Sequence, residues 1–298
     1  MELVKKIDGH VHCDMWNGHE LISFYGSRCA TPEQVREMYD EHGIEKGVLL
    51  PQCTPEEAFS MQSNELAARI VAEHPDTFFW YASIDPRLGY NNPRNNMAYI
   101  INHYKHMGAK GVGEITASLP ITDPLVDNLF FYAGECDMPV IFHMSPARYG
   151  FYGLIDDYGL PGLERAIKKF PKLKFFCHSA MFWSHISSDL DPREINGYPK
   201  GKVTPGRVVE LFRKYPNVYG DLSAGSGHNA LARDPEFAYQ FLEEFQDRLM
   251  FGTDACNYGD RMELSHWLDE AYLSGGISET VYRKVSRENT IRLLHLDV

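Results

Sequence analysis

Six residues that can bind a metal ion lie at or near the ends of short apolar segments: His10, His12, Glu114, His143, His178 and Asp254. Imidazole nitrogens and carboxylate oxygens form a mixed ligand set that suits Zn²⁺, Mn²⁺ and Fe²⁺ better than Ca²⁺. An ion of this kind lowers the pKa of a bound water molecule, and a neighbouring carboxylate can accept the proton. The six residues therefore predict a divalent metal centre. We expect Zn²⁺, with Mn²⁺ or Fe²⁺ as alternatives.

The spacing of the first two histidines supports this prediction. His10 and His12 are separated by one residue, and alternate side chains of an extended chain point to the same side, so both imidazoles can face one ion. Asp254 is the candidate base that accepts the proton of the water. Glu114 could be a ligand of a single ion, a bridge to a second ion, or a residue that orients a ligand histidine. One ion or two ions remain alternatives.

Eight short apolar segments recur along the chain and read as strands: 3–8, 46–51, 77–84, 109–115, 139–143, 173–178, 217–222 and 249–254. Several are almost continuously apolar, which is typical of parallel strands covered on both faces. Helical periodicity follows at 206–215 and 264–271, and the tail 278–296 reads as a final helix. We predict a (β/α)8 TIM barrel formed by one domain over residues 1–298. An open doubly wound sheet is less favoured, because no glycine-rich phosphate loop follows a strand.

Four Thr/Asp-Pro pairs predict where helices begin. Thr31, Thr54, Asp123 and Thr204 each precede a proline. A hydroxyl or carboxylate can cap the first turn of a helix, and proline suits the first helical position. We therefore expect helices to begin at residues 32, 55, 124 and 205.

The predicted barrel brings the ends of its strands to one face, where barrel enzymes form their sites. The connections 144–162 and 179–204, after strands five and six, are long and are expected to be functional loops. Aromatic and basic residues near this face could bind a flat or carboxylated small molecule. We expect substrate binding by Trp16, Arg148, Tyr149, Trp183 and His185, with Tyr25, Arg28 and Phe151 nearby.

Composition and charge narrow the choice of partner. The 298 residues carry a net charge of −12, which argues against a broad nucleic-acid footprint and favours a small-molecule substrate. The longest apolar stretches fall far short of the roughly 20 residues of a membrane span. The polar first six residues do not resemble a secretion signal. The six cysteines form no C-x-x-C pair, so we expect a cytoplasmic protein. The protein could form a homo-oligomer, and the sequence does not decide this.

Several motifs together resemble the amidohydrolase superfamily. They occupy residues 7–12, 111–115, 139–143, 176–178 and 249–254, in the order of that family. The similarity is greatest to the amidohydrolase-related branch, which contains metal-dependent hydrolases and non-oxidative decarboxylases. In its one-metal members the resemblance implies that His143 joins His10, His12 and Asp254 as a ligand, with His178 as proton donor or polariser. In two-metal members, His143 and His178 would hold a second ion bridged by Glu114.

Three functions follow as alternatives. We favour a metal-dependent hydrolase that cleaves an amide, lactone or ester of a small, carboxylated or cyclic molecule, with Asp254 and His178 as catalytic residues. The first alternative is a metal-dependent non-oxidative decarboxylase of an aromatic or unsaturated acid, in which His178 or Asp254 protonates carbon. The second alternative is a barrel that binds a metabolite without catalysis.

Overall fold

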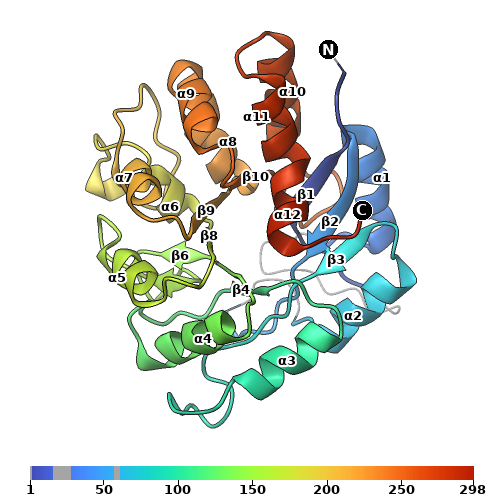
Figure 1. The fold of residues 1–298 in the computed structure, drawn as a ribbon, viewed down its shortest axis with the longest axis vertical. Coiled ribbons are helices and arrows are strands. Elements are labelled where there is room, and N and C mark those ends of the chain that lie inside the picture. Colours follow the sequence, from blue (N-terminus) through green and yellow to red (C-terminus); the bar gives the residue numbers. More distant parts are fainter. Residues whose placement is uncertain (1, 16–27, 57–60) are drawn as a thin grey trace.

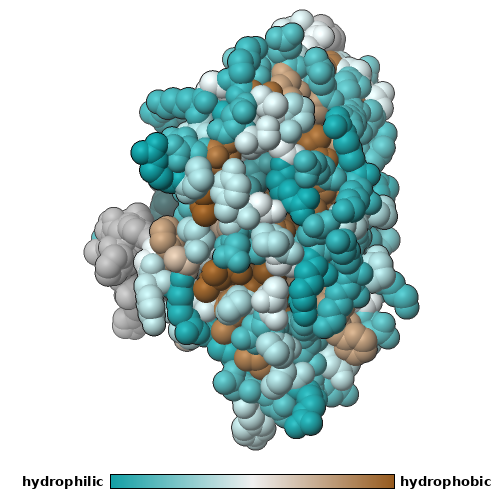
Figure 2. Space-filling view, turned by 90° about the vertical axis from the view of Figure 1, so that its left-hand side faces the viewer, coloured by the Kyte–Doolittle hydropathy of each residue, from teal (hydrophilic) through white to brown (hydrophobic). Residues whose placement is uncertain are grey.

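The computed structural model describes residues 2–15, 28–56 and 61–298. Parallel strands occupy its centre and helices surround them, as an α/β barrel requires (Figure 1). Trp16 and Tyr25, two of the residues predicted near the substrate, lie outside the described residues. The surface in Figure 2 is mostly hydrophilic, with apolar side chains in small patches. Among the described residues, no helix has the length and apolar character needed to cross a bilayer.

Eight strands form the barrel, and each overlaps one of the predicted apolar segments. They are β1 (Lys6–Val11), β2 (Ile44–Leu49), β3 (Phe78–Trp80), β4 (Val112–Ile115), β5 (Val140–Phe142), β8 (Phe175–Cys177), β9 (Val218–Asp221) and β10 (Leu249–Met250). Their residues are almost all buried, as expected for strands covered on both faces. The strands pair in parallel as two sheets, β1-β2-β3 and β4-β5-β8-β9-β10.

Isolated parallel bridges connect the two sheets at both junctions. Between β3 and β4, Ala82 pairs with Val112. Between β10 and β1, Val11 pairs with Ala255, and the Gly9 amide donates to the Phe251 carbonyl at 2.9 Å. The second junction places the first strand beside the last one. His10 and Asp254, which lie near opposite ends of the sequence, are therefore close together in the fold.

The long helices lie outside the strands. They are α1 (Pro32–His42), α2 (Asn64–Glu73), α3 (Ala98–His106), α4 (Pro124–Glu135), α5 (Pro161–Lys169), α7 (Arg207–Lys214), α8 (Ala224–Ala232), α9 (Pro235–Phe245) and α10 (Glu263–Leu273). Two predicted helix starts are confirmed, because Thr31 caps α1 and Asp123 caps α4. The predicted start at 205 is wrong, because α7 begins at Arg207 after Gly206, and the Thr204 hydroxyl donates to Asp189. Of the helix predicted to begin at 55, only residues 55 and 56 are described, and the residues that follow them lie outside the described residues.

The two long connections at the strand ends contain short elements of their own. In 144–162, the strands β6 (Met144–Ser145) and β7 (Leu154–Ile155) pair in parallel. In 179–204, the helix α6 (Ala180–Ser184) is followed by the 3-10 turn η1 (Pro192–Glu194).

The predicted C-terminal helix packs against the opposite end of the strands. It consists of α11 (Glu279–Arg283), the π-helical η2 (Lys284–Glu288) and α12 (Asn289–Leu294). Leu293, Leu294 and Leu296 join a buried cluster with strand residues such as Ile7 and Phe176. This helix covers the end of the barrel opposite the carboxyl ends of the strands. The candidate site lies at the carboxyl ends.

Candidate metal centre

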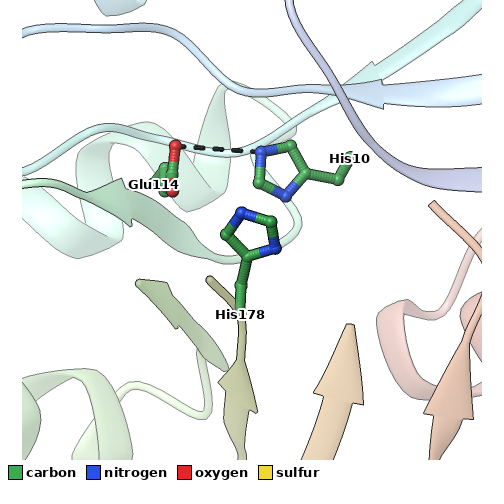
Figure 3. Close-up of side chains that lie close together, drawn as sticks. All are labelled: His10, Glu114 and His178. Atoms are coloured by element: carbon green, nitrogen blue, oxygen red, sulfur yellow. Dashed lines mark ion pairs between the residues drawn. The ribbon is translucent and has the colours of Figure 1, made fainter. Parts of the chain in front are cut away.

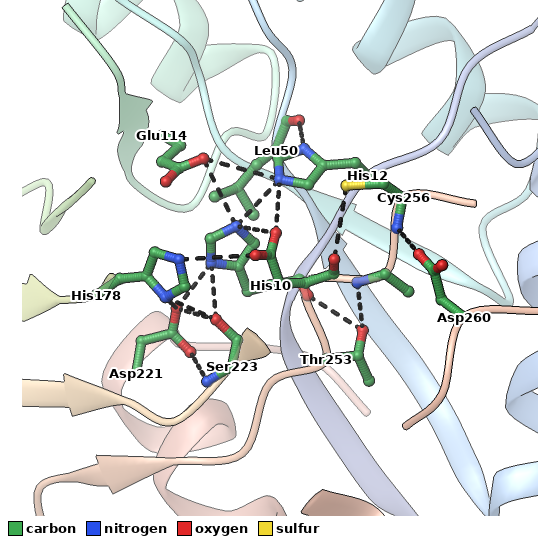
Figure 4. Close-up of polar contacts among 12 residues, drawn as sticks. His10, His12, Leu50, Glu114, His178, Asp221, Ser223, Thr253, Cys256 and Asp260 are labelled. Atoms are coloured by element: carbon green, nitrogen blue, oxygen red, sulfur yellow. Dashed lines mark hydrogen bonds and ion pairs between the residues drawn. The ribbon is translucent and has the colours of Figure 1, made fainter. Parts of the chain in front are cut away.

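The ends of β1 and β10 bring three predicted metal ligands together. The Nε2 atoms of His10 and His12 lie 3.1 Å apart. The Oδ1 atom of Asp254 lies 3.3 Å from the first nitrogen and 3.2 Å from the second. These three ligand atoms lie within reach of a single cation. Figure 4 shows His10 and His12 within a larger polar network.

Hydrogen bonds fix which ring nitrogen of each imidazole faces this point. The Nδ1 atom of His12 lies 2.9 Å from the Leu50 carbonyl oxygen, and that of His10 lies 2.7 Å from Oδ2 of Asp221. Carbonyl and ionised carboxylate oxygens only accept hydrogen bonds, so each Nδ1 carries the proton. When both rings are neutral, the lone pairs of both Nε2 atoms therefore point at each other and at Asp254. A cation would relieve this repulsion, so the residues fit a metal ion.

Glu114 and His178 form a second group around His10 (Figure 3). Oε2 of Glu114 lies 3.7 Å from Nε2 of His10 and 3.8 Å from Nε2 of His12. Its other oxygen, Oε1, is buried and has no hydrogen-bond partner among the described residues. A buried carboxylate oxygen without a partner is costly, and a cation would satisfy it. Glu114 is thus placed as a ligand or as a charge beside the ion.

His143 lies next to the centre but belongs to neither group of converging ligand atoms among the described residues. Its ring is 5.5 Å from that of His178 and 4.2 Å from that of Tyr152. Burial, together with the nearby His178, lowers the pKa of His143 to about 3. Its imidazole is therefore neutral.

The charges of the cluster favour a cation. Burial alone would lower the pKa of His12, but the hydrogen bond and charge of Asp254 and the charge of Glu114 raise it to about 9. Burial would raise the pKa of Asp254, yet the adjacent histidines hold it well below its usual range. The buried acids thus attract positive charge to the point between the imidazoles. A divalent ion can replace protons there.

Asp221 and Ser223 are functional-site residues that the sequence reasoning missed. Asp221 ends β9 and contacts His10, and the Ser223 hydroxyl lies 2.9 Å from Nδ1 of His178. The signal was present, because Asp221 lies near the end of the seventh apolar segment, 217–222, as Asp254 lies at the end of the eighth, 249–254. Its role depends on a contact between β9 and β1, which no local pattern reveals.

A buried carboxylate supports the junction that carries the ligands. Oδ1 of Asp8 accepts hydrogen bonds from the backbone amides of His10 and Thr253, each at 2.9 Å. Its Oδ2 accepts from the hydroxyl groups of Thr253 at 2.6 Å and Tyr39 at 2.7 Å. These four bonds fix the end of β1 against the chain that leads to Asp254.

Three residues without the freedom of glycine adopt positive φ at the strand ends. They are Ser179 (103°), Ala224 (61°) and Asp254 (55°). Such conformations cost energy, and they cluster at sites where the surrounding structure enforces them. The first two follow His178 and Ser223, and the third is a candidate ligand. The chain therefore turns sharply where the polar groups face the centre.

Of the predicted substrate-binding residues that the structure describes, none belongs to the two groups of converging ligand atoms. Trp183 is buried, and its Nε1 donates to the Asp221 carbonyl at 2.8 Å. His185 is buried between the Met181 carbonyl and the Gly159 amide. Arg148 and Tyr149 are exposed on the connection after β5. The structure thus brings the predicted metal ligands His10, His12 and Asp254 together, but it does not bring the predicted substrate-binding residues together in the same way.

The fold and the centre define an α/β barrel with a candidate metal site at the carboxyl ends of its strands. The amidohydrolase family model matches residues 7–296. The chain therefore belongs to the amidohydrolase family, which confirms the resemblance read from its motifs. No curated protein matches the sequence.

Solved structures with the same fold cover nearly the whole chain at low sequence identity. An uncharacterised TIM-barrel protein from Bordetella bronchiseptica is 20% identical, with a TM-score of 0.66 over 98% of this chain and 99% of that chain. A probable 2-pyrone-4,6-dicarboxylic acid hydrolase from Acinetobacter baumannii is 14% identical (TM-score 0.61, 98% and 100%). A dihydroxybenzoic acid decarboxylase from Polaromonas, with bound manganese and the inhibitor 2-nitroresorcinol, is 17% identical (TM-score 0.57, 99% and 98%).

Proposed function

We propose that this protein is a metal-dependent hydrolase that cleaves an amide, lactone or ester of a small, carboxylated or cyclic molecule. One observation carries the proposal. The Nε2 lone pairs of His10 and His12 converge at 3.1 Å, with Oδ1 of Asp254 within 3.3 Å of both. Membership of the amidohydrolase family supports the same reading.

The ligands of the ion would be His10, His12 and Asp254, with Glu114 beside them. A divalent cation at this point supplies an acidified water molecule and polarises a carbonyl group. We propose Zn²⁺ as the first ion to test. Mn²⁺ follows, because a structurally similar decarboxylase binds manganese.

Asp254 and His178 would move the protons. The side chain of Asp254 is 22% exposed, so one face of the carboxylate can meet a substrate. Its Oδ2 lies 3.7 Å from Nε2 of His178. Asp254 would accept the proton of the attacking water. Hydrogen bonding to Asp221 and nearby acidic charge outweigh burial and raise the pKa of His178 to about 9, so its imidazole can donate a proton to the leaving group.

A decarboxylase is the second candidate, and the placement of His178 favours it. A protonated imidazole beside a carboxylate can deliver its proton to the carbon atom from which CO₂ leaves. The Polaromonas decarboxylase shows that the same fold accommodates an enzyme of that name. The two candidates use the same residues and differ in the substrate bond that breaks.

A substrate panel with two readouts distinguishes these functions. The protein is stripped of metal, loaded with Zn²⁺ or Mn²⁺, and offered carboxylated lactones, N-acyl amides, aryl esters and hydroxybenzoates. Release of acid from a lactone, amide or ester supports the hydrolase. Release of CO₂ without hydrolysis contradicts it in favour of the decarboxylase. Metal and ligand binding with neither product would contradict both and indicate a binding barrel.

Variants connect the turnover to the centre. We expect His12→Ala and Asp254→Asn to reduce turnover by at least about 100-fold, because general-base catalysis alone contributes roughly 10²–10⁴-fold. Asp76→Asn is the matched control, since Asp76 is an exposed acid away from the cluster. Circular dichroism checks that each variant is folded. Wild-type turnover in either cluster variant would contradict the proposed site.

A further inference from the structure

One carboxylate contacts both the candidate metal ligand His10 and the candidate proton donor His178. Oδ2 of Asp221 lies 2.7 Å from Nδ1 of His10 and 3.3 Å from Nδ1 of His178. These side chains are buried and come from three different strand ends. No solvent competes for their hydrogen bonds, so the carboxylate determines how both rings are held.

The Ser223 hydroxyl completes this contact. Its Oγ lies 2.7 Å from Oδ2 of Asp221, 2.9 Å from Nδ1 of His178 and 3.2 Å from Nδ1 of His10. A hydroxyl has one proton to donate. When the hydroxyl donates its proton to Asp221, its oxygen can accept a hydrogen bond from the nearer of the two imidazoles, which is that of His178. His178 is therefore held mainly through Ser223, whereas His10 is held directly.

Backbone contacts fix the carboxylate in this orientation. Oδ1 of Asp221 accepts a hydrogen bond from the Ser223 amide at 3.0 Å, which leaves Oδ2 for the side chains. Gly252 lies against the network, and a Cβ atom there would come within 2.7 Å of both Oδ1 of Asp221 and Cβ of Ser223. The close packing leaves the carboxylate no room to rotate.

We propose that Asp221, together with Ser223, is a positioning pair that sets the tautomer of both His10 and His178. Each ring keeps its proton on Nδ1, and both Nε2 atoms are directed into the centre. The same buried carboxylate thereby orients the residue that would bind the ion and the residue that would transfer the proton. The roles of the two histidines rest on the proposed function. The tautomers do not, because they follow from these hydrogen bonds alone.

Asp221→Asn and Ser223→Ala test the two halves of the pair separately. In Asp221→Asn, the new side-chain amide nitrogen would offer hydrogen where the carboxylate accepts it, so we expect His10 to move its proton to Nε2. Zn²⁺ affinity should then fall by roughly 10–100-fold, the usual effect of losing a residue that orients a metal ligand. Ser223→Ala should leave Zn²⁺ affinity within about threefold of the wild type, because His10 keeps its direct bond. His178 then keeps only the longer contact of 3.3 Å with Asp221, so the population of its Nδ1–H tautomer should fall.

The measurements do not need turnover. ¹⁵N NMR of the imidazoles in metal-free protein reports each tautomer at a pH above the pKa of His178, which is about 9, because its ring is neutral there. The signals are assigned from His10→Gln and His178→Gln. Competition with a chelator reports Zn²⁺ affinity. Ser226→Ala is the matched control, since Ser226 has a buried hydroxyl without a hydrogen-bond partner three residues away. It should change neither readout.

The outcomes separate this inference from the proposed function. Unchanged tautomers in both variants would overturn the inference, as would unchanged Zn²⁺ affinity in a folded Asp221→Asn variant. If that variant fails to fold, the His178 signal of Ser223→Ala decides: a fall in the population of the Nδ1–H tautomer supports the pair and an unchanged population overturns it. A wild-type protein with both tautomers and tight Zn²⁺ binding, but no hydrolysis, would contradict only the proposed function.

Discussion

Histidines in this structure have different roles according to the partners of their two ring nitrogens. In His10 and His12 a buried acceptor takes Nδ1–H and leaves the Nε2 lone pair for the centre. In His185 both nitrogens are occupied, because Nδ1 donates to the Met181 carbonyl at 2.7 Å and Nε2 accepts from the Gly159 amide at 3.0 Å. His185 has no lone pair left for a substrate or a metal.

The two hydrogen bonds of His185 predict a pH dependence of stability. Burial lowers the pKa of His185 in the folded protein, so the unfolded chain, with a pKa near 6.5, binds the proton more readily. The stabilisation is therefore complete above about pH 6.5 and is lost as the pH falls below that value. Urea unfolding at pH 8 and pH 5.5 measures the loss.

His185→Gln is the variant that isolates this effect, because the side-chain amide can accept from Gly159 without titrating. We expect the variant to lose less free energy of unfolding between pH 8 and pH 5.5 than the wild type. The exposed His103 provides a control in His103→Gln, which should keep the wild-type dependence. An equal pH dependence in the His185 variant would contradict the prediction.

At the residue scale, the sequence could predict which side chains reach the centre, but not which hydrogen bonds their ring nitrogens and oxygens make. The types and strand-end positions of His10, His12 and Asp254 were sufficient to place them together. The tautomers depend on Leu50 and Asp221, which belong to other strands. His185 is a histidine in a loop at the strand ends, so its residue type and position suggested a role in substrate binding. Its hydrogen bonds to the Met181 and Gly159 backbone could not be predicted from periodicity.

At the scale of elements, hydrophobic periodicity predicted the strands well, and helix starts depended on tertiary contacts. All eight strands bury both faces, so their apolar runs are strong signals. Thr204 has the sequence pattern of a helix cap, but its hydroxyl donates to Asp189, and α7 begins only after Gly206. A capping pattern is only local, and a partner elsewhere can override it.

The helix α12 stabilises the barrel from the end opposite the site. Leu294 is 2% exposed and lies in the cluster with Ile7 and Val48 of the strands. We expect Leu294→Ala to lower the free energy of unfolding by about 2–5 kcal/mol, since it leaves a cavity in a packed interior. Leu273→Ala, at a position 46% exposed, should cost far less. Urea unfolding compares them, and equal losses would contradict the role of α12.

At the scale of the whole molecule, we propose that residues 1–298 form one domain, because the two ends of the chain build the site together. β1 supplies His10, the segment after β10 supplies Asp254, and the C-terminal helix packs below both strands. By itself, the net charge of −12 excluded few classes of function. The important acids are the few that lie buried beside histidines, which total charge cannot distinguish from those on the surface.

A site assembled from both ends of the chain should couple metal binding to the stability of the whole fold. The unfolded chain has no preformed site, so Zn²⁺ at roughly 100 times its dissociation constant should add about 2.7 kcal/mol to the free energy of unfolding. Thermal unfolding with and without a chelator measures this gain as a shift in Tm. His12→Ala should lose most of the shift, whereas Asp76→Asn should keep it. An equal shift in His12→Ala would mean that the ion binds elsewhere, because removal of a true ligand must weaken the coupling between the ion and the junction of β1 with β10.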